Sequence, residues 1–157
     1  VVAGSLKNKQ VDALFGPCDL LLMTAAVCDL RPVERVSHKV KKTELAMTAA
    51  FEPVPDILAT VAARKRPDQC VVGFAAETDN LAAHAMAKLH AKRLDFIAAN
   101  QVGGSNSAFD SDDNRVHLIG ADGSSDEFGP APKLEIARLM LAQIARHLAS
   151  PTSPTLG

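Results

Sequence analysis

Basic side chains concentrate in two short segments of the sequence. The first contains Lys39, Lys41 and Lys42, and the second contains Lys88 and Lys92. Ammonium groups bind phosphate and carboxylate groups, so either segment could hold a polyphosphate. In an extended chain Lys39 and Lys41 would point to the same side, and Lys88 and Lys92 share one stripe of a helix. The alternative for both segments is an ordinary charged surface exposed to solvent.

A second group of candidate residues follows an apolar run at residues 20–23. The run lacks polar alternation, which indicates a strand of a parallel sheet that is covered on both faces. Thr24, Ala25 and Ala26 follow, and small residues let a ligand approach the backbone, while Asp29 adds a carboxylate. Because ligands collect at the carboxyl ends of strands in open α/β sheets, we expect the binding site here.

Strand and helix patterns alternate along the rest of the chain and must position these groups. This alternation implies an α/β fold, with a parallel sheet between helices, to which a late hairpin is added. The predicted strands are residues 20–23, a short alternating strand at Leu45, Met47 and Ala49, and residues 70–76 and 96–99. The predicted hairpin joins residues 115–119 and 126–128, residues 32–44 form an extended flap, and the helices cover residues 57–66, 81–93 and 133–148.

Each of the two longer predicted helices has an apolar side. For the middle helix that side contains Leu81, Ala82, Ala85, Met86 and Leu89. For the last helix it contains Leu134, Ala137, Leu141, Ile144 and Leu148. The first helix starts after Pro55, and Asp56 is suited to its first turn because a carboxylate stabilises the positive end of a helix.

Composition excludes several classes of protein. The 157 residues fit one domain, and 17 basic against 18 acidic residues give a net charge of −1, which argues against general attraction to nucleic acid. No apolar run approaches the roughly 20 residues of a membrane span. The three cysteines and five histidines lack metal-ligand spacing, so we expect no metal site and reduced, buried thiols in a cytoplasmic protein. Neither standard glycine-rich phosphate loop occurs.

Several motifs, taken in order, resemble the phosphopantothenoylcysteine synthetase family, the ligase half of a bifunctional coenzyme A biosynthesis flavoprotein. They begin with Ala25-Ala-Val-Cys-Asp-Leu-Arg-Pro, Lys39-Val-Lys-Lys and Pro55-Asp-Ile-Leu. They continue with Val72-Gly-Phe-Ala-Ala-Glu-Thr, Lys88 with Lys92, Asp95-Phe-Ile-Ala-Ala-Asn and Phe109-Asp-Ser-Asp-Asp-Asn. The similarity spans about residues 18–148.

The resemblance implies a Rossmann-like three-layer fold and a two-step ligation in coenzyme A biosynthesis. The carboxylate of 4′-phosphopantothenate would attack a nucleoside triphosphate, usually CTP, to give an acyl-nucleotidyl intermediate and pyrophosphate. The amine of cysteine would then displace the nucleotide. The resemblance also implies Mg²⁺ bound with CTP, a homodimer, and a flavin-dependent decarboxylase usually fused to the ligase, with no flavin in this segment.

The same resemblance implies roles for individual residues. Lys39 would be catalytic, acting on the phosphates and the reacting carboxylate, and Ala25 and Ala26 would border the phosphopantothenate. The implied nucleotide-binding residues are Met23, Thr24, Ala25, Asp29, Lys39, Pro55, Asp56, Ile57, Leu58, Phe74, Lys88 and Lys92.

The chain also departs from the family pattern. Leu30 replaces an aromatic residue, and Val54 stands where a polar residue often precedes Pro-Asp-Ile. The family's first strand, glycine-rich loop and a downstream Asn should precede residue 1. We therefore expect residues 1–149 to be a single, N-terminally incomplete ligase domain that turns over poorly alone, and residues 150–157 to be a disordered tail. The alternative is a non-catalytic nucleotide-binding or dimerisation module.

Overall fold

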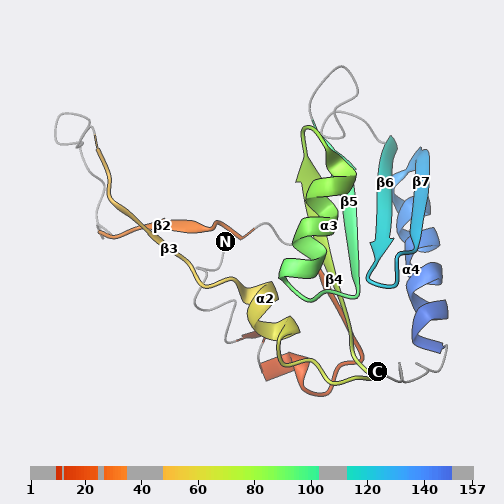
Figure 1. The fold of residues 1–157 in the computed structure, drawn as a ribbon, viewed down its shortest axis with the longest axis horizontal. Helices are drawn as coiled ribbons and strands as arrows, with labels where there is room; N and C mark the ends of the chain where they lie inside the picture. Colours follow the sequence, from red (N-terminus) through yellow and green to blue (C-terminus); the bar gives the residue numbers. More distant parts are fainter. Residues whose placement is uncertain (1–9, 12, 25–26, 35–47, 103–112, 150–157) are drawn as a thin grey trace.

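The computed structural model of the chain describes residues 10–11, 13–24, 27–34, 48–102 and 113–149. These residues form a five-stranded sheet, ordered β1-β4-β5-β6-β7, and a separate two-stranded ribbon, β2-β3 (Figure 1). The strands are β1 (Leu20–Met23), β2 (Leu30–Pro32), β3 (Phe51–Pro53), β4 (Cys70–Glu77), β5 (Phe96–Gln101), β6 (Asp113–Gly120) and β7 (Ser125–Pro132). The helices are α2 (Ile57–Ala62), α3 (Leu81–Ala91) and α4 (Lys133–Ala149). No helix in the described ranges is long and apolar enough to cross a bilayer.

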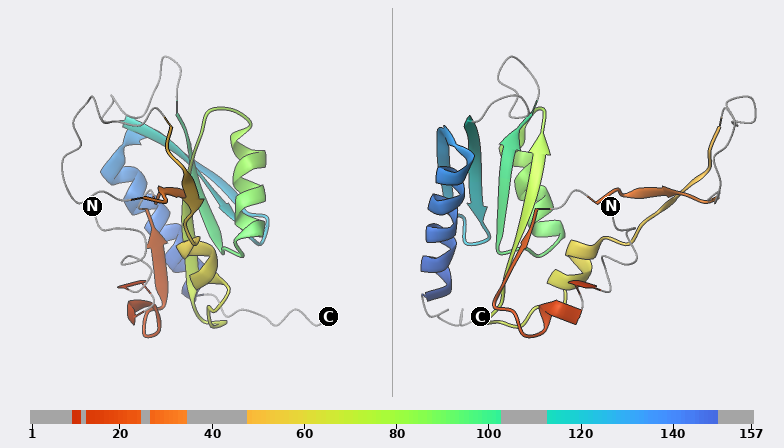
Figure 2. Two further views of the ribbon diagram at one scale, coloured as in Figure 1. Left: turned by 90° about the vertical axis from the view of Figure 1, so that its left-hand side faces the viewer. Right: turned by 180° about the vertical axis from the view of Figure 1, so that it is seen from behind.

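The sheet lies between two layers of helix, as the alternating pattern predicted. Strands β1, β4 and β5 are parallel, and the hairpin β6-β7 extends them in antiparallel fashion. Residues of α2 and α3 pack in one core cluster and residues of α4 in another, on the opposite face of the sheet. The left panel of Figure 2 shows the sheet between α3 and α4. The predicted α/β fold class is confirmed.

Strand β1 has the predicted bounds but not the predicted burial. It pairs only with β4 within the described part of the chain, and its register ends at Met23 opposite Gly73, halfway along β4. Leu20 packs in the cluster that contains α4, and Leu21 and Met23 pack in the cluster on the opposite face, whereas Leu22 is exposed. Our prediction of a strand covered on both faces is therefore only partly correct. Because β1 ends halfway along β4, it leaves space beyond its carboxyl end.

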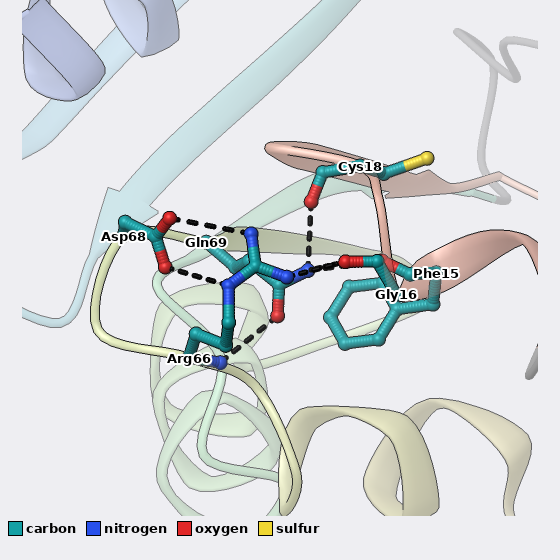
Figure 3. Close-up of polar contacts among 6 residues, drawn as sticks. All are labelled: Phe15, Gly16, Cys18, Arg66, Asp68 and Gln69. Carbon is teal, nitrogen blue, oxygen red and sulfur yellow. Dashed lines mark hydrogen bonds and ion pairs between the residues drawn. The ribbon is translucent and has the colours of Figure 1, made fainter.

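A cluster of polar contacts attaches the turn before β1 to the start of β4 (Figure 3). The buried Gln69 amide donates to the carbonyl oxygens of Phe15, at 2.9 Å, and Cys18, at 2.7 Å. Its own side-chain oxygen accepts from the backbone N–H of Arg66 at 2.9 Å. Because every polar atom of this buried amide is used, the contacts fix where β1 begins.

The helices α2 and α3 end earlier than predicted. Helix α2 stops at Ala62 rather than Arg66, and Asp56 is its N-cap rather than part of its first turn. Helix α3 stops at Ala91, and its N-cap Asn80 has left-handed backbone angles with no side-chain capping bond. The predicted apolar side of α3 is only partly correct. Ala85 and Leu89 are buried and Leu81 is half-buried, whereas the other two predicted positions, Ala82 and Met86, are exposed.

Helix α4 is present as predicted but buries a different stripe. Its buried residues are Ile136, Met140 and Ile144. Of the predicted apolar side only Ile144 is buried, and Leu134, Ala137, Leu141 and Leu148 are exposed, with Leu134 64% accessible. Both stripes have helical spacing, so periodicity alone could not choose between them.

The ribbon β2-β3 projects away from the body of the molecule (Figures 1 and 2). Its strand β3 lies at Phe51–Pro53 and not at the predicted position. Ala49 belongs to no strand, and Leu45 and Met47 lie outside the described residues. Pro32 belongs to strand β2 rather than to the predicted flap, most of which also lies outside the described residues.

Backbone pairing explains why the ribbon tolerates two prolines. The N–H of Val54 donates to Asp29 at 2.8 Å and that of Val33 donates to Ala50 at 3.0 Å. Hydrogen-bonded and non-hydrogen-bonded pairs alternate along an antiparallel ladder. The pairs Leu30–Pro53 and Pro32–Phe51 are therefore non-hydrogen-bonded pairs, whose N–H positions point outward. A missing N–H therefore costs no ladder bond there.

Candidate functional site

A pocket of about 170 Å³ opens where β1 ends. It lies at the carboxyl end of a parallel strand, as we expected for the binding site. The pocket is lined by Met23, Val27, Cys28, Asp29, Val54, Pro55, Asp56, Ile57, Leu58, Phe74 and Lys92.

The pocket joins segments that are far apart in the sequence. Residues 27–29 lead from β1 to the ribbon, and residues 54–58 lead from the ribbon into α2. Phe74 comes from β4, and Lys92 directly follows α3. The pocket therefore combines an aromatic ring, carboxylates, an ammonium group and the first residues of a helix, which together suit a ligand with a ring and phosphates.

Gly73 allows the helical layer to come close to the strand beside the pocket. A Cβ atom at this position would lie 2.7 Å from Leu94 Cδ1 and 3.0 Å from Leu58 Cδ2. Such distances are too short without movement of those side chains. Because Leu58 also lines the pocket, the glycine contributes to the position of one wall.

Asp56 occupies the start of α2 and also binds Lys92. Its carboxylate accepts from the Ala59 N–H at 2.9 Å and lies 2.8 Å from Lys92 Nζ. Partial burial works to raise the pKa of Asp56, but the Ala59 hydrogen bond and the Lys92 ammonium outweigh it, so the pKa is lowered. The carboxylate is therefore ionised at neutral pH. The start of α2 and Lys92 therefore already share the Asp56 carboxylate before any anion enters the pocket.

Lys88 lies one helical turn from Lys92 but does not line the pocket. Its Nζ is 2.6 Å from Glu77 Oε1, and His84 Nδ1 is 3.4 Å from the other oxygen of the same carboxylate. The Glu77 side chain is only 11% exposed. The hydrogen bond from Lys88 lowers the pKa of Glu77, so this carboxylate is charged at neutral pH.

The structure brings together most of the residues that the resemblance implied for nucleotide binding. It leaves Thr24 exposed and away from the pocket lining. Ala25, Ala26 and Lys39 lie outside the described residues. The members of the set that line the pocket are Met23, Asp29, Pro55, Asp56, Ile57, Leu58, Phe74 and Lys92.

Sequence reasoning did not assign Val27 and Val54 to the site and placed Cys28 only at its border, although all three line the pocket. Their places beside Asp29 and Pro55 were the only available signal. Our expectation of buried thiols is wrong for Cys28, which is exposed, and only partly right for Cys18, which is half-buried. Cys70 is buried, and this burial, together with Asp95, raises the pKa of its thiol to about 12.

A family model described as the DNA/pantothenate metabolism flavoprotein C-terminal domain matches residues 3–148. The chain belongs to this family. It is similar to the coenzyme A biosynthesis bifunctional protein CoaBC of Bacillus subtilis (strain 168), with 36% identity over 88% of this chain and 34% of that protein. The chain thus spans about a third of the length of the curated relatives it matches.

Solved structures of similar proteins have the same fold. A crystal structure of the C-terminal domain of CoaBC superposes with a TM-score of 0.73 at 30% identity, over 95% of this chain and 64% of that one. The Cab2 mutant H337A in complex with phosphopantothenate-cysteine is similar in fold, with a TM-score of 0.60 at 20% identity, over 82% of this chain and 44% of that one. The resemblance inferred from the motifs is confirmed at the level of the family.

Proposed function

We propose that this chain is the nucleotide-binding part of a phosphopantothenate–cysteine ligase in coenzyme A biosynthesis. The carboxylate of 4′-phosphopantothenate attacks the α-phosphorus of CTP, and the bond to pyrophosphate breaks. The amine of cysteine then attacks the acyl carbon of the resulting acyl-cytidylate, an amide forms, and CMP leaves.

One observation carries this proposal. Of the residues that the family resemblance implies for nucleotide binding, eight line a single pocket at the carboxyl end of β1. They come from β1, the residue before β2, the segment before α2, the start of α2, β4 and the residue after α3, so no local pattern could have grouped them.

Different pocket residues contact different parts of the nucleotide. Phe74 offers an aromatic surface to the base or sugar. Backbone N–H groups at the start of α2 and the Lys92 ammonium bind the phosphates. Lys88 extends the cationic stripe along α3 toward the end of β4. Three N–H donors on an ammonium group let each lysine keep its carboxylate partner while it donates to a phosphate.

Lys39 acts on the reacting groups in this proposal. It belongs to the sequence between β2 and β3, and an ammonium group beside both the α-phosphate and the attacking carboxylate would neutralise charge as the acyl-phosphate bond forms. Ala25 and Ala26 provide close backbone approach for the phosphopantothenate at the end of β1.

Mg²⁺ enters this reaction as a companion of the triphosphate. Within the described ranges no three His, Cys, Asp or Glu side chains converge on a possible metal site. Magnesium in nucleotide sites binds mainly to phosphates and water with one or two carboxylates, and Asp29 in the pocket can supply one. Such an ion would shield charge on the phosphates.

We also propose that the chain forms a homodimer through the ribbon. Residues Leu30, Pro32, Phe51 and Pro53 share one face of β2-β3, because side chains alternate along each strand and paired residues point to the same side. Leu30 is 55% and Phe51 57% exposed. An apolar face on a ribbon that projects from the body suits contact with a second copy.

The test of the ligase proposal combines binding with turnover. CTP and Mg²⁺ are first titrated into the protein by calorimetry, and 4′-phosphopantothenate and cysteine are then added to measure pyrophosphate release. We expect CTP to bind and pyrophosphate to appear only when 4′-phosphopantothenate is present. Binding without pyrophosphate would favour the non-catalytic nucleotide-binding module. Absence of CTP binding would exclude both.

Two lysine variants separate binding from chemistry. Lys92→Ala should weaken CTP binding by about tenfold, the effect of losing a charge-assisted hydrogen bond of roughly 1.4 kcal/mol. Lys39→Ala should abolish pyrophosphate release while CTP still binds, and thermal melts check that the variant remains folded. Lys133→Ala, at the start of α4, is the control and should change neither quantity.

A further inference from the structure

The pocket has two walls whose separation depends on the ribbon. Residues 27–29 run directly into β2, and β3 runs directly into residues 54–58. The Val54 N–H donates to the Asp29 carbonyl at 2.8 Å, where the ribbon meets the pocket. The first backbone pair of the ribbon is thus also a contact between the two walls.

Backbone pairing alone is a weak clamp. Each strand of the ribbon is three residues long, and an isolated two-stranded ribbon is marginally stable in water. Any cross-strand contact between its side chains therefore makes a large difference to how well the walls are held.

One ion pair crosses the ribbon directly outside the pocket. Arg31 is paired with Glu52 in the strand register, and Arg31 Nε donates to Glu52 Oε1 at 2.5 Å. Because side chains alternate along a strand, both lie on the same ribbon face as Asp29 and Val54. The apolar face proposed for the dimer is the opposite one. The Arg31 and Glu52 side chains are 40% and 43% exposed, so the pair is accessible to experiment.

We propose that Arg31 and Glu52 are positioning residues for the nucleotide site. Their ion pair holds residues 27–29 and 54–58 at the separation that a nucleoside triphosphate requires. This inference rests on the proposed function for the identity of the ligand, although the bracing of the two walls does not.

Two other roles for the pair make different predictions. If the two side chains only changed the electrostatic potential of the pocket, Arg31→Glu would weaken binding of an anion and Glu52→Arg would strengthen it. If Arg31 contacted the phosphates directly, its loss would not be repaired by any change at residue 52. A brace instead requires that both single reversals weaken binding and that the double reversal restores it.

The experiment measures the Kd of CTP with Mg²⁺ by calorimetry for the protein and three variants. These are Arg31→Glu, Glu52→Arg and the double variant. Each single reversal should raise the Kd by about fivefold, the size expected from losing an ion pair of this exposure and adding a like-charge contact. The double variant should return to within about twofold of the unchanged protein. Tighter binding by Glu52→Arg, or a double variant as weak as Arg31→Glu, would overturn the inference.

A matched pair elsewhere on the chain provides the control. Arg115 and Glu127 form a cross-strand ion pair between β6 and β7, with exposed side chains comparable to those of the ribbon pair. Neither residue lines the pocket. Arg115→Glu should leave the Kd of CTP unchanged. An equal loss of affinity in this variant would mean that distant charge alone explains the result, and would also overturn the inference.

Cys28 reports on the walls without any nucleotide. It is exposed and lines the pocket, whereas Cys70 is buried. In a Cys18→Ser background, a maleimide should label Cys28 several-fold faster in each single reversal than in the unchanged pair, and at the original rate in the double reversal. Equal rates in all four proteins would refute the brace. If the labelling pattern holds but CTP does not bind the unchanged protein, the proposed function fails and the brace stands.

Discussion

Carboxylates hold Lys88 and Lys92, two of the lysines predicted for phosphate binding. Lys88 is paired with Glu77 at the end of β4, and Lys92 with Asp56 at the start of α2. The sequence placed the two lysines on one stripe of a helix, which is correct for Lys88, whereas Lys92 is the residue that follows the last turn of α3. It could not reveal their partners, because those belong to other elements and meet α3 only in the folded protein.

Glu77→Gln should make stability less sensitive to acid. Because the folded state lowers the pKa of Glu77, its pairing contributes stability above the unfolded-state pKa, and this contribution is lost as the pH falls through the folded-state value. At pH 7 the variant should lose about 1 kcal/mol, the usual size for one partly buried charge-assisted hydrogen bond. The difference should shrink as the pH falls below the unfolded-state pKa of about 4.3.

Urea unfolding of Glu77→Gln and the unchanged protein at pH 7, 5 and 3 measures this effect. Glu34→Gln, at an exposed position, is the control and should leave the free energy of unfolding at pH 7 unchanged. A difference between the two proteins that stayed constant from pH 7 to pH 3 would contradict the ionic origin of the Glu77 contribution.

At the scale of elements, helix α4 and strand β4 determine how the layers pack. Helix α4 buries Ile144 and leaves Leu141 in solvent, although both belong to the predicted apolar side. Strand β4 carries Gly73 where Leu94 and Leu58 approach the strand closely. Each feature can be tested by comparing a substitution at that position with a matched control substitution.

Truncations on α4 should distinguish its two apolar stripes. Ile144→Ala removes a fully buried side chain and should cost about 2–4 kcal/mol of unfolding free energy. Leu141→Ala removes an exposed one and should cost less than about 0.5 kcal/mol. Chemical denaturation of both variants makes the comparison, and similar losses would mean that the Leu141 stripe is also covered.

Gly73→Ala should destabilise the protein and disturb the pocket together. The new methyl group must displace Leu94 and Leu58, at a cost of about 1–3 kcal/mol, and CTP binding should weaken because Leu58 lines the pocket. Gly16→Ala is the control, since no atom lies within 4 Å of its added Cβ. Thermal melts and calorimetry measure both effects; a stable, fully binding Gly73→Ala protein would show that this close approach is unimportant.

At the scale of the whole molecule, a body with two helical layers carries a projecting ribbon. One ribbon face is apolar and the other contains the Arg31–Glu52 pair next to the pocket. If the apolar face binds a second copy, dimerisation and nucleotide binding depend on the same short ribbon, and each should stabilise the other.

Phe51→Asp should convert the dimer to a monomer. A carboxylate introduced on the apolar ribbon face would have to be desolvated in the interface, which is strongly unfavourable. Sedimentation velocity at micromolar concentrations should show the mass halved. Leu134→Asp, on the exposed stripe of α4, should leave the dimer intact. A monomeric unchanged protein, or a dimeric Phe51→Asp variant, would rule out this interface.

Local patterns in the sequence sufficed for the order and type of most elements. Apolar runs marked β1, β4 and β5, and Pro55 with Asp56 marked the start of α2, because strand and helix periods depend on neighbouring residues. The ordered motifs identified the family and eight residues that line one pocket. Such local rules apply without any knowledge of the tertiary contacts.

Only the tertiary structure decided which surfaces are covered and which charges meet. Two stripes of α4 have the same period, and the position of the sheet selects Ile136, Met140 and Ile144. The pairing of Lys92 with Asp56, and the exposure of Leu22 in β1, likewise depend on segments distant in sequence. Burial and ion pairing depend on which residues are close in three dimensions and not on their separation in the sequence. They are therefore defined only when the helices pack on the sheet.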